Sequence, residues 1–430
     1  MENFLVGFIF IIGIIVITSI VNERKLHLHH DIALVLVPSL VSCLIIILQK
    51  FNLGGTTLYI DAFKDFKFDT FVLECLLGFM FFASASKIHL NKFVNNIAPI
   101  ISLASVNILV YSILYGLIFY LVSIVLNLDF NILVCFLLGS ILSLTDSVAT
   151  IDILKKSGIS KSFVAIMEGE SLLGDGVVVT LYVFLSSIIK NGISENFFLI
   201  LIKEIFGAII VGLVVSWLLF KLIKLTNKPI IHILISLLTV SLSYVVCEHY
   251  GFSGVIASVV CGMYFSYKNK KIARWKEVVD SKDLYNDFWN IAESLLNGIL
   301  YVLVGLSVVS MEIDLKILIL IPIAIILNLL SRGLGVSIST IILGKKNVST
   351  KYSFKHTVSL LTWSGLKGGA SLALVIATRE ILTAEQYMIM FNSTLVTILF
   401  TTIVQGLFTN RVYKYIETKR DEKALIKRSN

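Results

Sequence analysis

Long apolar runs alternate with short polar stretches along the whole chain. A helix that crosses a bilayer needs about 20 mainly apolar residues, so the pattern predicts an all-α integral membrane protein with about 13 transmembrane helices. The predicted segments are 4–20, 32–48, 70–86, 97–126, 131–154, 162–188, 197–224, 229–247, 253–267, 287–309, 315–343, 355–377 and 386–409.

Two of these segments carry polar or glycine-rich stretches at their centres. The fifth segment holds SLTDSVAT at 143–150, and the twelfth holds WSGLKGGAS at 363–371. Because they lie seven segments apart, the two would cross the membrane in opposite directions. Paired interrupted segments in two halves of a chain indicate a transporter with its binding site near the middle of the bilayer. We therefore predict two inverted six-helix repeats, segments 1–6 and 8–13, with discontinuous helices at segments 5 and 12.

The basic residues between the segments predict how the chain is inserted. The loops after odd-numbered segments and the C-terminal tail hold 27 of the 36 Lys and Arg residues, whereas the opposite loops hold six. Cytoplasmic loops carry the excess of basic residues in membrane proteins. We expect a multi-pass plasma membrane protein with its N-terminus outside and its C-terminus in the cytoplasm. The same rule explains the net charge of +8, so no nucleic-acid partner is expected.

Composition supports this assignment and limits the other possibilities. Hydrophobic residues make up 57% of the chain and charged residues 15%, whereas soluble domains contain about 25% charged residues. We predict one transmembrane domain over 1–410 and a short basic tail over 411–430. The five cysteines lie in apolar runs without CxxC spacing, so neither a disulfide framework nor a cofactor or metal cluster is predicted. The Lys-, Ile- and Asn-rich composition is typical of a bacterial chain.

The sixth segment carries three carboxylates among apolar residues. Its central sequence, VAIMEGESLLGDGVVVTLYVF at 164–184, contains Glu168, Glu170 and Asp175. A carboxylate inside the bilayer is costly unless it faces protein or water, and such residues commonly mark ion or proton pathways. Structural ion pairing is the alternative interpretation.

Oxygen ligands for a small cation are available in this segment. Ser171 and Asp175 are four residues apart and would lie on one helix face, with Glu170 beside it. Such oxygens suit Na⁺, Li⁺ or K⁺ better than a transition metal, and unwound backbone around Thr145 and Asp146 would add carbonyl groups. A desolvated carboxylate favours its protonated form and a bound cation favours its ionised form. A site at Asp175 would therefore hold either a proton or a cation, which is the requirement for antiport; a structural, hydrogen-bonded Asp175 is the alternative.

Two cations also lie within apolar segments. Arg332 needs a buried partner, and Glu170 is the candidate, which would leave Asp175 free to titrate. Lys367 lies between glycines in the interrupted twelfth segment, where it would either offset helix dipoles or neutralise Asp146.

Three further polar residues lie in the predicted spans. Glu293 and Asn297 are one turn apart in the tenth segment, and hydrogen bonding between helices is expected for them. Glu74 in the third segment is open to either a functional or a structural interpretation.

Several of these stretches together resemble the sodium/proton exchanger family, the monovalent cation–proton antiporters of the branch marked by an Asn-Asp pair. The resemblance covers segments 3 to 13 in the family's order. It is carried by TDSVAT at 145–150, EGESLLGDG at 168–176, SGVIASVVCG at 253–262, FWNIAESLLNGILYVLVGL at 288–306, SRGLGV at 331–336 and WSGLKGGASLAL at 363–374.

The resemblance implies a thirteen-helix, dimeric antiporter with two crossed, broken helices and a funnel that faces the cytoplasm. By position, Asp175 would be the carboxylate that binds ion and proton, and Glu170 would also pair with Arg332. The residues that the resemblance places at the ion and proton site are Asp175, Glu170, Ser171, Thr145 and Asp146, of which Asp175, Glu170, Ser171 and Thr145 would coordinate Na⁺.

The chain departs from the family pattern at three positions. Gly174 replaces the Asn of the Asn-Asp pair, which adds flexibility worth about 1 kcal/mol in a helix. Ser147 replaces a proline, and Lys367 replaces an arginine and with it a planar bidentate donor.

The function predicted from the sequence is secondary active exchange of Na⁺ or Li⁺ for H⁺ by alternating access, with electroneutral stoichiometry. The expected partners are monovalent cations, protons, the lipid bilayer and a second copy of the chain. The alternatives are K⁺/H⁺ or mixed-cation exchange, a transport-inactive ion sensor and an ion channel. No nucleophile–base pair or metal-ligand set indicates an enzyme.

Overall fold

The computed structural model of the chain describes residues 2–50, 76–88, 90–146, 148–156, 158–192, 197–226, 228–272, 279–311, 314–344 and 352–429. Glu74 and Ser147 lie outside these residues, so the sequence-based interpretations of both remain predictions.

The described chain is helical and contains no strand. The first half comprises α1 (Glu2–Val21), α2 (His30–Lys50), α5 (Leu77–Lys87), α6 (Leu90–Asn95), α7 (Ile97–Ser102), α8 (Ile108–Val125), α9 (Ile132–Ser143), α10 (Val148–Lys156), α11 (Lys161–Asn191) and α12 (Phe197–Ile223). The second half comprises α13 (Pro229–His249), α14 (Gly254–Ile272), α15 (Val279–Leu306), α16 (Leu315–Leu343), α18 (Phe354–Trp363), α19 (Gly369–Ala377), α20 (Ala384–Leu399) and α21 (Gly406–Ser429).

The helices follow the apolar pattern of the sequence. Each of the thirteen predicted segments coincides with a described helix or with two consecutive helices, apart from the part of the third segment outside the described residues. Within the described residues, nine helices are long and apolar enough to cross a membrane. The all-α membrane fold is confirmed, whereas the exact number of crossings and the inverted repeat stay predictions.

The two predicted interruptions are present. The fifth segment is divided into α9 and α10, and the twelfth into α18 and α19. The two unwound stretches meet, because the Asp146 amide donates a backbone hydrogen bond to the Leu366 carbonyl at 2.8 Å. A short π-helical stretch after α20 supports the second break: the Thr401 hydroxyl accepts from the Lys367 amide, and the Thr402 hydroxyl donates to the Lys367 carbonyl, both at 3.1 Å. These bonds satisfy backbone groups that a buried, unwound chain leaves unpaired. We call this meeting point the crossing.

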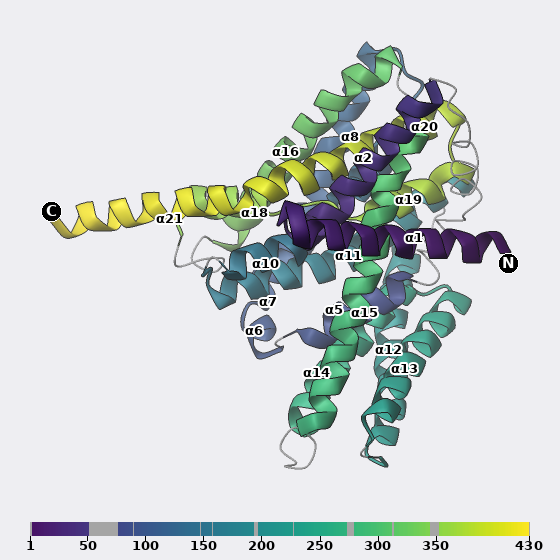
Figure 1. The fold of residues 1–430 in the computed structure, drawn as a ribbon, viewed down its shortest axis with the longest axis vertical. Coiled ribbons are helices and arrows are strands. Elements are labelled where there is room, and N and C mark those ends of the chain that lie inside the picture. The colour runs from purple at the N-terminus through teal and green to yellow at the C-terminus, as the bar shows by residue number, and fades with distance from the viewer. Residues whose placement is uncertain are drawn as a thin grey trace.

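The helices form two groups that pack mainly within themselves (Figure 1). The first group, here called the scaffold bundle, consists of α1, α2, α5 and α12–α15. The second, here called the crossing bundle, consists of α7–α11, α16 and α18–α21. Contacts between the groups are sparse and include those of α15 with α19 and of α5 and α14 with α11. The crossing therefore lies in one bundle and faces the other.

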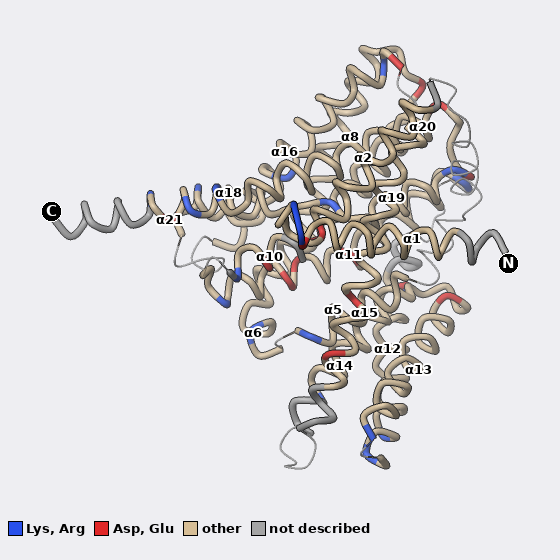
Figure 2. The backbone as a smooth tube through the Cα atoms, in the orientation of Figure 1, with Lys and Arg blue, Asp and Glu red and all other residues tan. Residues whose placement is uncertain are grey.

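The surface of the bundles is apolar over much of its area, as a bilayer requires. Large side chains such as Ile210, Trp217, Leu234 and Val245 on α12 and α13 are about half exposed or more. Figure 2 shows that charged residues gather toward helix ends, with a smaller set inside the molecule near α10, α11 and α15. That inner set marks the site described below.

The last helix is packed into the crossing bundle at its beginning. Tyr413 and Ile416 of α21 are buried at 3% exposure, and α21 contacts both α10 and α18. Tyr352, just before α18, donates a 2.6 Å hydrogen bond to the Glu417 carboxylate. Beyond these contacts α21 projects away from the bundles (Figure 1).

Candidate functional site

A cavity of about 420 Å³ lies between the two bundles. Residues of α5 and α15 form its scaffold wall, and residues of α10, α11, α19 and the unwound stretch 144–146 form the opposite wall. Its polar and charged lining residues are Ser84, Lys87, Thr145, Asp146, Asp152, Lys155, Glu168, Ser171, Asp175, Asn290, Glu293, Asn297 and Tyr301. Five carboxylates and two lysines in this set give the cavity an excess of negative charge, which favours cations.

Asp175 lies on the wall of this cavity. Asp175 is 9% exposed, and its Oδ1 atom has no hydrogen-bond partner among the described residues. The helix that carries it, α11, starts with Ser160 as N-cap, whose side chain accepts from the Phe163 amide, and continues unbroken through Gly174. Asp175 is therefore held on a regular helix at the cavity wall, with one carboxylate oxygen that makes no hydrogen bond among the described residues.

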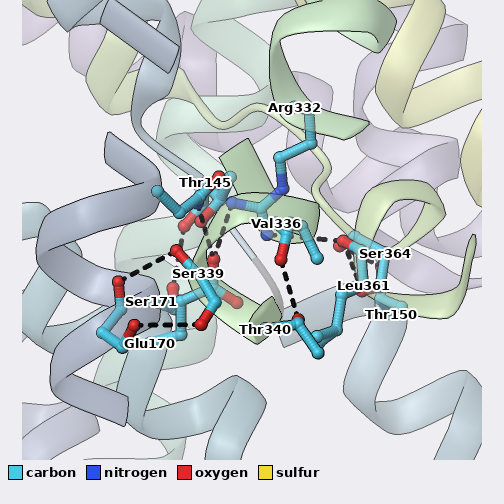
Figure 3. A network of polar contacts seen from close by, with 12 residues as sticks. Thr145, Thr150, Glu170, Ser171, Arg332, Val336, Ser339, Thr340, Leu361 and Ser364 are labelled. Atoms are coloured by element: carbon cyan, nitrogen blue, oxygen red, sulfur yellow. Dashed lines mark hydrogen bonds and ion pairs between the residues drawn. The ribbon is translucent and has the colours of Figure 1, made fainter. Parts of the chain in front are cut away.

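The residue one turn earlier connects this helix to the crossing. The Ser171 hydroxyl donates to the Thr145 carbonyl at 2.8 Å (Figure 3). Thr145 is itself buried in the unwound stretch, and both residues line the cavity with Asp175. The structure thus brings together a carboxylate, a hydroxyl and freed backbone carbonyls, the hard oxygen donors that alkali cations prefer.

Asp146 lies in the same cavity and is tightly held. Its Oδ2 atom accepts a 2.5 Å hydrogen bond from the hydroxyl of Tyr301 on α15. A Cβ atom at Gly368 would lie only 2.8 Å from that same oxygen, so only glycine permits this close approach. Gly368 is the N-cap residue of α19, and a carboxylate beside a helix N-terminus is stabilised by the helix dipole.

Glu170 and Arg332 form a buried ion pair behind the cavity wall. Arg332 Nη1 lies 2.6 Å from Glu170 Oε1, and the two side chains are 4% and 6% exposed (Figure 3). Asn107 Nδ2 donates to the same Glu170 oxygen at 3.5 Å, and Arg332 Nη2 donates to the Leu361 carbonyl at 3.4 Å. The structure thus pairs these residues as expected from the sequence. Glu170 is not among the cavity-lining residues, so the structure separates it from Asp175 and Ser171.

Lys367 lies over an aromatic ring of α8. Its Nζ atom lies 4.8 Å from the ring centroid of Tyr111, and the residue is 1% exposed. Nζ has no hydrogen-bond partner among the described residues, and no ion pair with Asp146 is recorded there. Of the two alternatives left open by the sequence, neutralisation of Asp146 is therefore not supported by the contacts. Asp146 instead contacts Tyr301 and the start of α19.

Glu293 and Tyr301 of the scaffold wall differ in how far the local sequence indicates their contacts. Glu293 accepts hydrogen bonds from Ser84 and Lys87 of α5, which confirms the bonding between helices that was expected for Glu293. Tyr301 was not predicted at the site at all. Tyrosine is frequent in membrane helices, and nothing in the local pattern distinguishes Tyr301 from the other tyrosines of the chain.

The described residues contain no group of three or more His, Cys, Asp and Glu side chains placed to hold a metal ion. The chemistry that Asp175, Ser171 and Thr145 offer together is reversible binding of a monovalent cation or a proton.

Comparisons with known proteins identify the same type of molecule. A family model described as "Sodium/hydrogen exchanger, transmembrane" matches residues 46–414. The Na⁺/H⁺ antiporter NhaH of Halobacillus aidingensis is 30% identical over 294 residues, covering 67% of this chain and 70% of its own. The Na⁺/H⁺ antiporter NhaP of Pseudomonas aeruginosa is 23% identical over 364 residues, covering 82% and 84%. The solved structure of the sodium proton antiporter MjNhaP1 from Methanocaldococcus jannaschii superposes with a TM-score of 0.73 at 19% identity, over 96% of this chain and 99% of that one, which shows the shared fold.

Proposed function

The chain belongs to the sodium/hydrogen exchanger family, and from this premise we propose that it exchanges Na⁺ for H⁺ with Asp175 as the carrier of both ions. The observation that carries the proposal is the position of Asp175: it faces the cavity and has an oxygen without a recorded partner, while nearby Glu170 is neutralised by Arg332. Sodium is the cation named for the related antiporters.

The exchange follows from competition at one carboxylate. A cation that enters the acidic cavity binds the ionised Asp175, with oxygens of Ser171 and Thr145 completing its shell. A proton that binds Asp175 removes the charge that holds the cation. The site is therefore occupied either by a cation or by a proton. Each passage of the site across the membrane then carries one positive charge, whichever direction it takes. One-for-one, electroneutral exchange is the stoichiometry that this competition supports.

Access alternates through movement of the two bundles. Because the site lies at their boundary and contacts between them are sparse, the crossing bundle can shift against the scaffold bundle without unfolding either. The unwound stretches move with α11, so the site travels as one unit. Alternating access of this kind, around a site at broken helices, is the general mechanism of secondary transporters.

The remaining assignments rest on charge distribution and on the family. We place the chain in a bacterial cell membrane as a multi-pass protein, with its N-terminus outside and its cavity open to the cytoplasm. Lys87 and Lys155 at the cavity lie next to loops on the side richer in basic residues. A homodimer is the proposed assembly, and the protein moves ions without chemical conversion.

The test is a transport measurement in inverted membrane vesicles that hold a preformed proton gradient. Addition of Na⁺ or Li⁺ should collapse the gradient, and the response should be insensitive to a clamped membrane potential. Collapse by K⁺ alone would replace sodium with potassium as the substrate. A current that follows the membrane potential would indicate a channel, and no response to any of the three cations would overturn transport altogether.

A further inference from the structure

One hydrogen bond joins the two bundles beside the ion site. Tyr301 belongs to α15 of the scaffold bundle, and its hydroxyl donates to Asp146 Oδ2 of the crossing bundle at 2.5 Å. The tyrosine is 3% exposed, and both partners line the cavity. A hydrogen bond to a carboxylate is among the stronger kinds in proteins.

Tyr301 also marks the inner end of the cavity. Along α15 the lining positions Asn290, Glu293, Asn297 and Tyr301 recur every three or four residues and form one helix face. One turn further along the helix, Val304 continues this face, but it is buried at 0% exposure and does not line the cavity. The closed part of the boundary between the bundles therefore begins at Tyr301.

The acceptor of this hydrogen bond is fixed to the crossing. The Asp146 amide donates to the Leu366 carbonyl at 2.8 Å, and its carboxylate packs against Gly368. When the crossing moves, Asp146 has to move with it, whereas Tyr301 stays with α15. The bond between them cannot persist through a shift of one bundle against the other.

We propose that the Tyr301 hydroxyl is a positioning group that holds the cavity-open conformation by binding Asp146 and that releases it in each transport cycle. This inference rests on the alternating access of the proposed function. It assigns Tyr301 no contact with the transported ion, and it gives Asp146 a role in conformational control besides any contact with a cation.

Loss of the Tyr301–Asp146 hydrogen bond should shift the populations of the two conformations. A hydrogen bond to a charged group, when removed from one state alone, changes the equilibrium between two conformations by about tenfold or more. Tyr301→Phe keeps the buried ring and removes only the hydroxyl. It should increase the rare, oppositely open conformation by that factor.

Val304 provides the reporter for this conformation. Val304→Cys, in a chain whose five native cysteines are replaced by alanine, is treated with a charged, membrane-impermeant thiol reagent on intact cells, opposite the proposed cytoplasmic cavity mouth. Labelling should be slow with Tyr301 present and about tenfold faster with Tyr301→Phe. The matched control is Tyr285→Phe, because Tyr285 is also a buried tyrosine of α15, at 4% exposure, but does not line the cavity. In an Asp146→Ala background, Tyr301→Phe should have no additional effect.

Three results would overturn the inference: an unchanged or slower labelling rate with Tyr301→Phe, an equal increase with Tyr285→Phe, or a full additional effect of Tyr301→Phe in the Asp146→Ala background. Thermal unfolding of each purified variant identifies any increase that comes from general loosening. Labelling needs no transport, so the two proposals can fail separately. The expected labelling in a chain whose vesicles show no Na⁺-driven proton movement would reject ion exchange and support the contact between the bundles. Normal exchange with unchanged labelling would remove the role of Tyr301 alone.

Discussion

Arg332 of α16 and Glu170 of α11 meet at 2.6 Å in a setting with almost no solvent exposure. This pair explains how two carboxylates five residues apart on one helix acquire different roles. Glu170 is neutralised by a fixed guanidinium, while Asp175 faces the cavity with an unpaired oxygen. The pair also joins α11 to α16 next to the crossing, so its first effect is on the stability of the site.

Removing one partner of this pair should destabilise the protein. Arg332→Met leaves the Glu170 carboxylate buried without a cation and should lower the free energy of unfolding by about 3–5 kcal/mol. The double variant Arg332→Met/Glu170→Gln should recover most of that loss. Ser171→Ala, which removes one hydrogen bond to a carbonyl, should cost about 1 kcal/mol. Thermal unfolding and the yield of folded protein in detergent measure all three, and equal yields for Arg332→Met and Ser171→Ala would contradict a structural role of the pair.

Loss of the Asp175 charge should abolish exchange while the fold is kept. Asp175→Asn preserves shape but cannot alternate between a bound cation and a proton, so Na⁺ should no longer collapse the proton gradient in vesicles. The control is Glu204→Gln, which neutralises another buried carboxylate, at 8% exposure on α12 and outside the cavity lining. That variant should transport normally. Sodium-driven exchange by Asp175→Asn at the wild-type rate would remove Asp175 from the mechanism.

Replacing Lys367, the other buried cation, with methionine should stabilise the protein, whereas Arg332→Met should destabilise it. Lys367 Nζ has no hydrogen-bond partner among the described residues and lies over the Tyr111 ring. Burying an unpaired polar group costs about 1–3 kcal/mol, so Lys367→Met should raise the free energy of unfolding by a similar amount. Thermal unfolding of Lys367→Met and of Arg332→Met, measured side by side, compares the two effects on stability. A large destabilisation by Lys367→Met would mean that the amine has a partner essential to the fold.

Gly174 should tolerate a side chain. A Cβ atom there would meet only the terminal methyl of Ile108, at 3.0 Å, and a flexible side chain can move away. Because α11 is regular at this point, Gly174→Ala should stabilise the protein by up to about 1 kcal/mol, and Gly174→Asn should fold and retain exchange. Gly139→Ala is the contrasting variant, since its Cβ would lie 2.5 Å from the Ser112 carbonyl. A lower melting temperature for Gly174→Ala than for the unmodified chain would contradict this prediction.

The sequence contained enough information for the helices, the two breaks and the buried pair. Polar residues in apolar segments have few acceptable placements, so Thr145, Asp146 and the glycines around Lys367 predicted unwound backbone, and the charge of Arg332 required an acid such as Glu170. These inferences depend on local composition and on the cost of burying charge.

The arrangement of the two bundles could not be read from the same pattern. Tyr301 becomes part of the site only because α15 packs beside the crossing, and no residue near it in sequence indicates that contact. The contact of Lys367 Nζ with the Tyr111 ring joins the second break to α8. Both are properties of packing between distant segments, which a single sequence does not encode locally.

The packing of the last helix changes how the end of this chain should be treated. The helix α21 runs through the expected boundary at 410/411 without a break, and Tyr413 and Ile416 beyond that boundary are buried against neighbours that include α10. A protein shortened to Asn410 would lose two interior side chains beside the half-helix that follows Asp146. Truncation for crystallisation or fusion to a fluorescent reporter is therefore better placed after Glu417 than at the start of the basic residues.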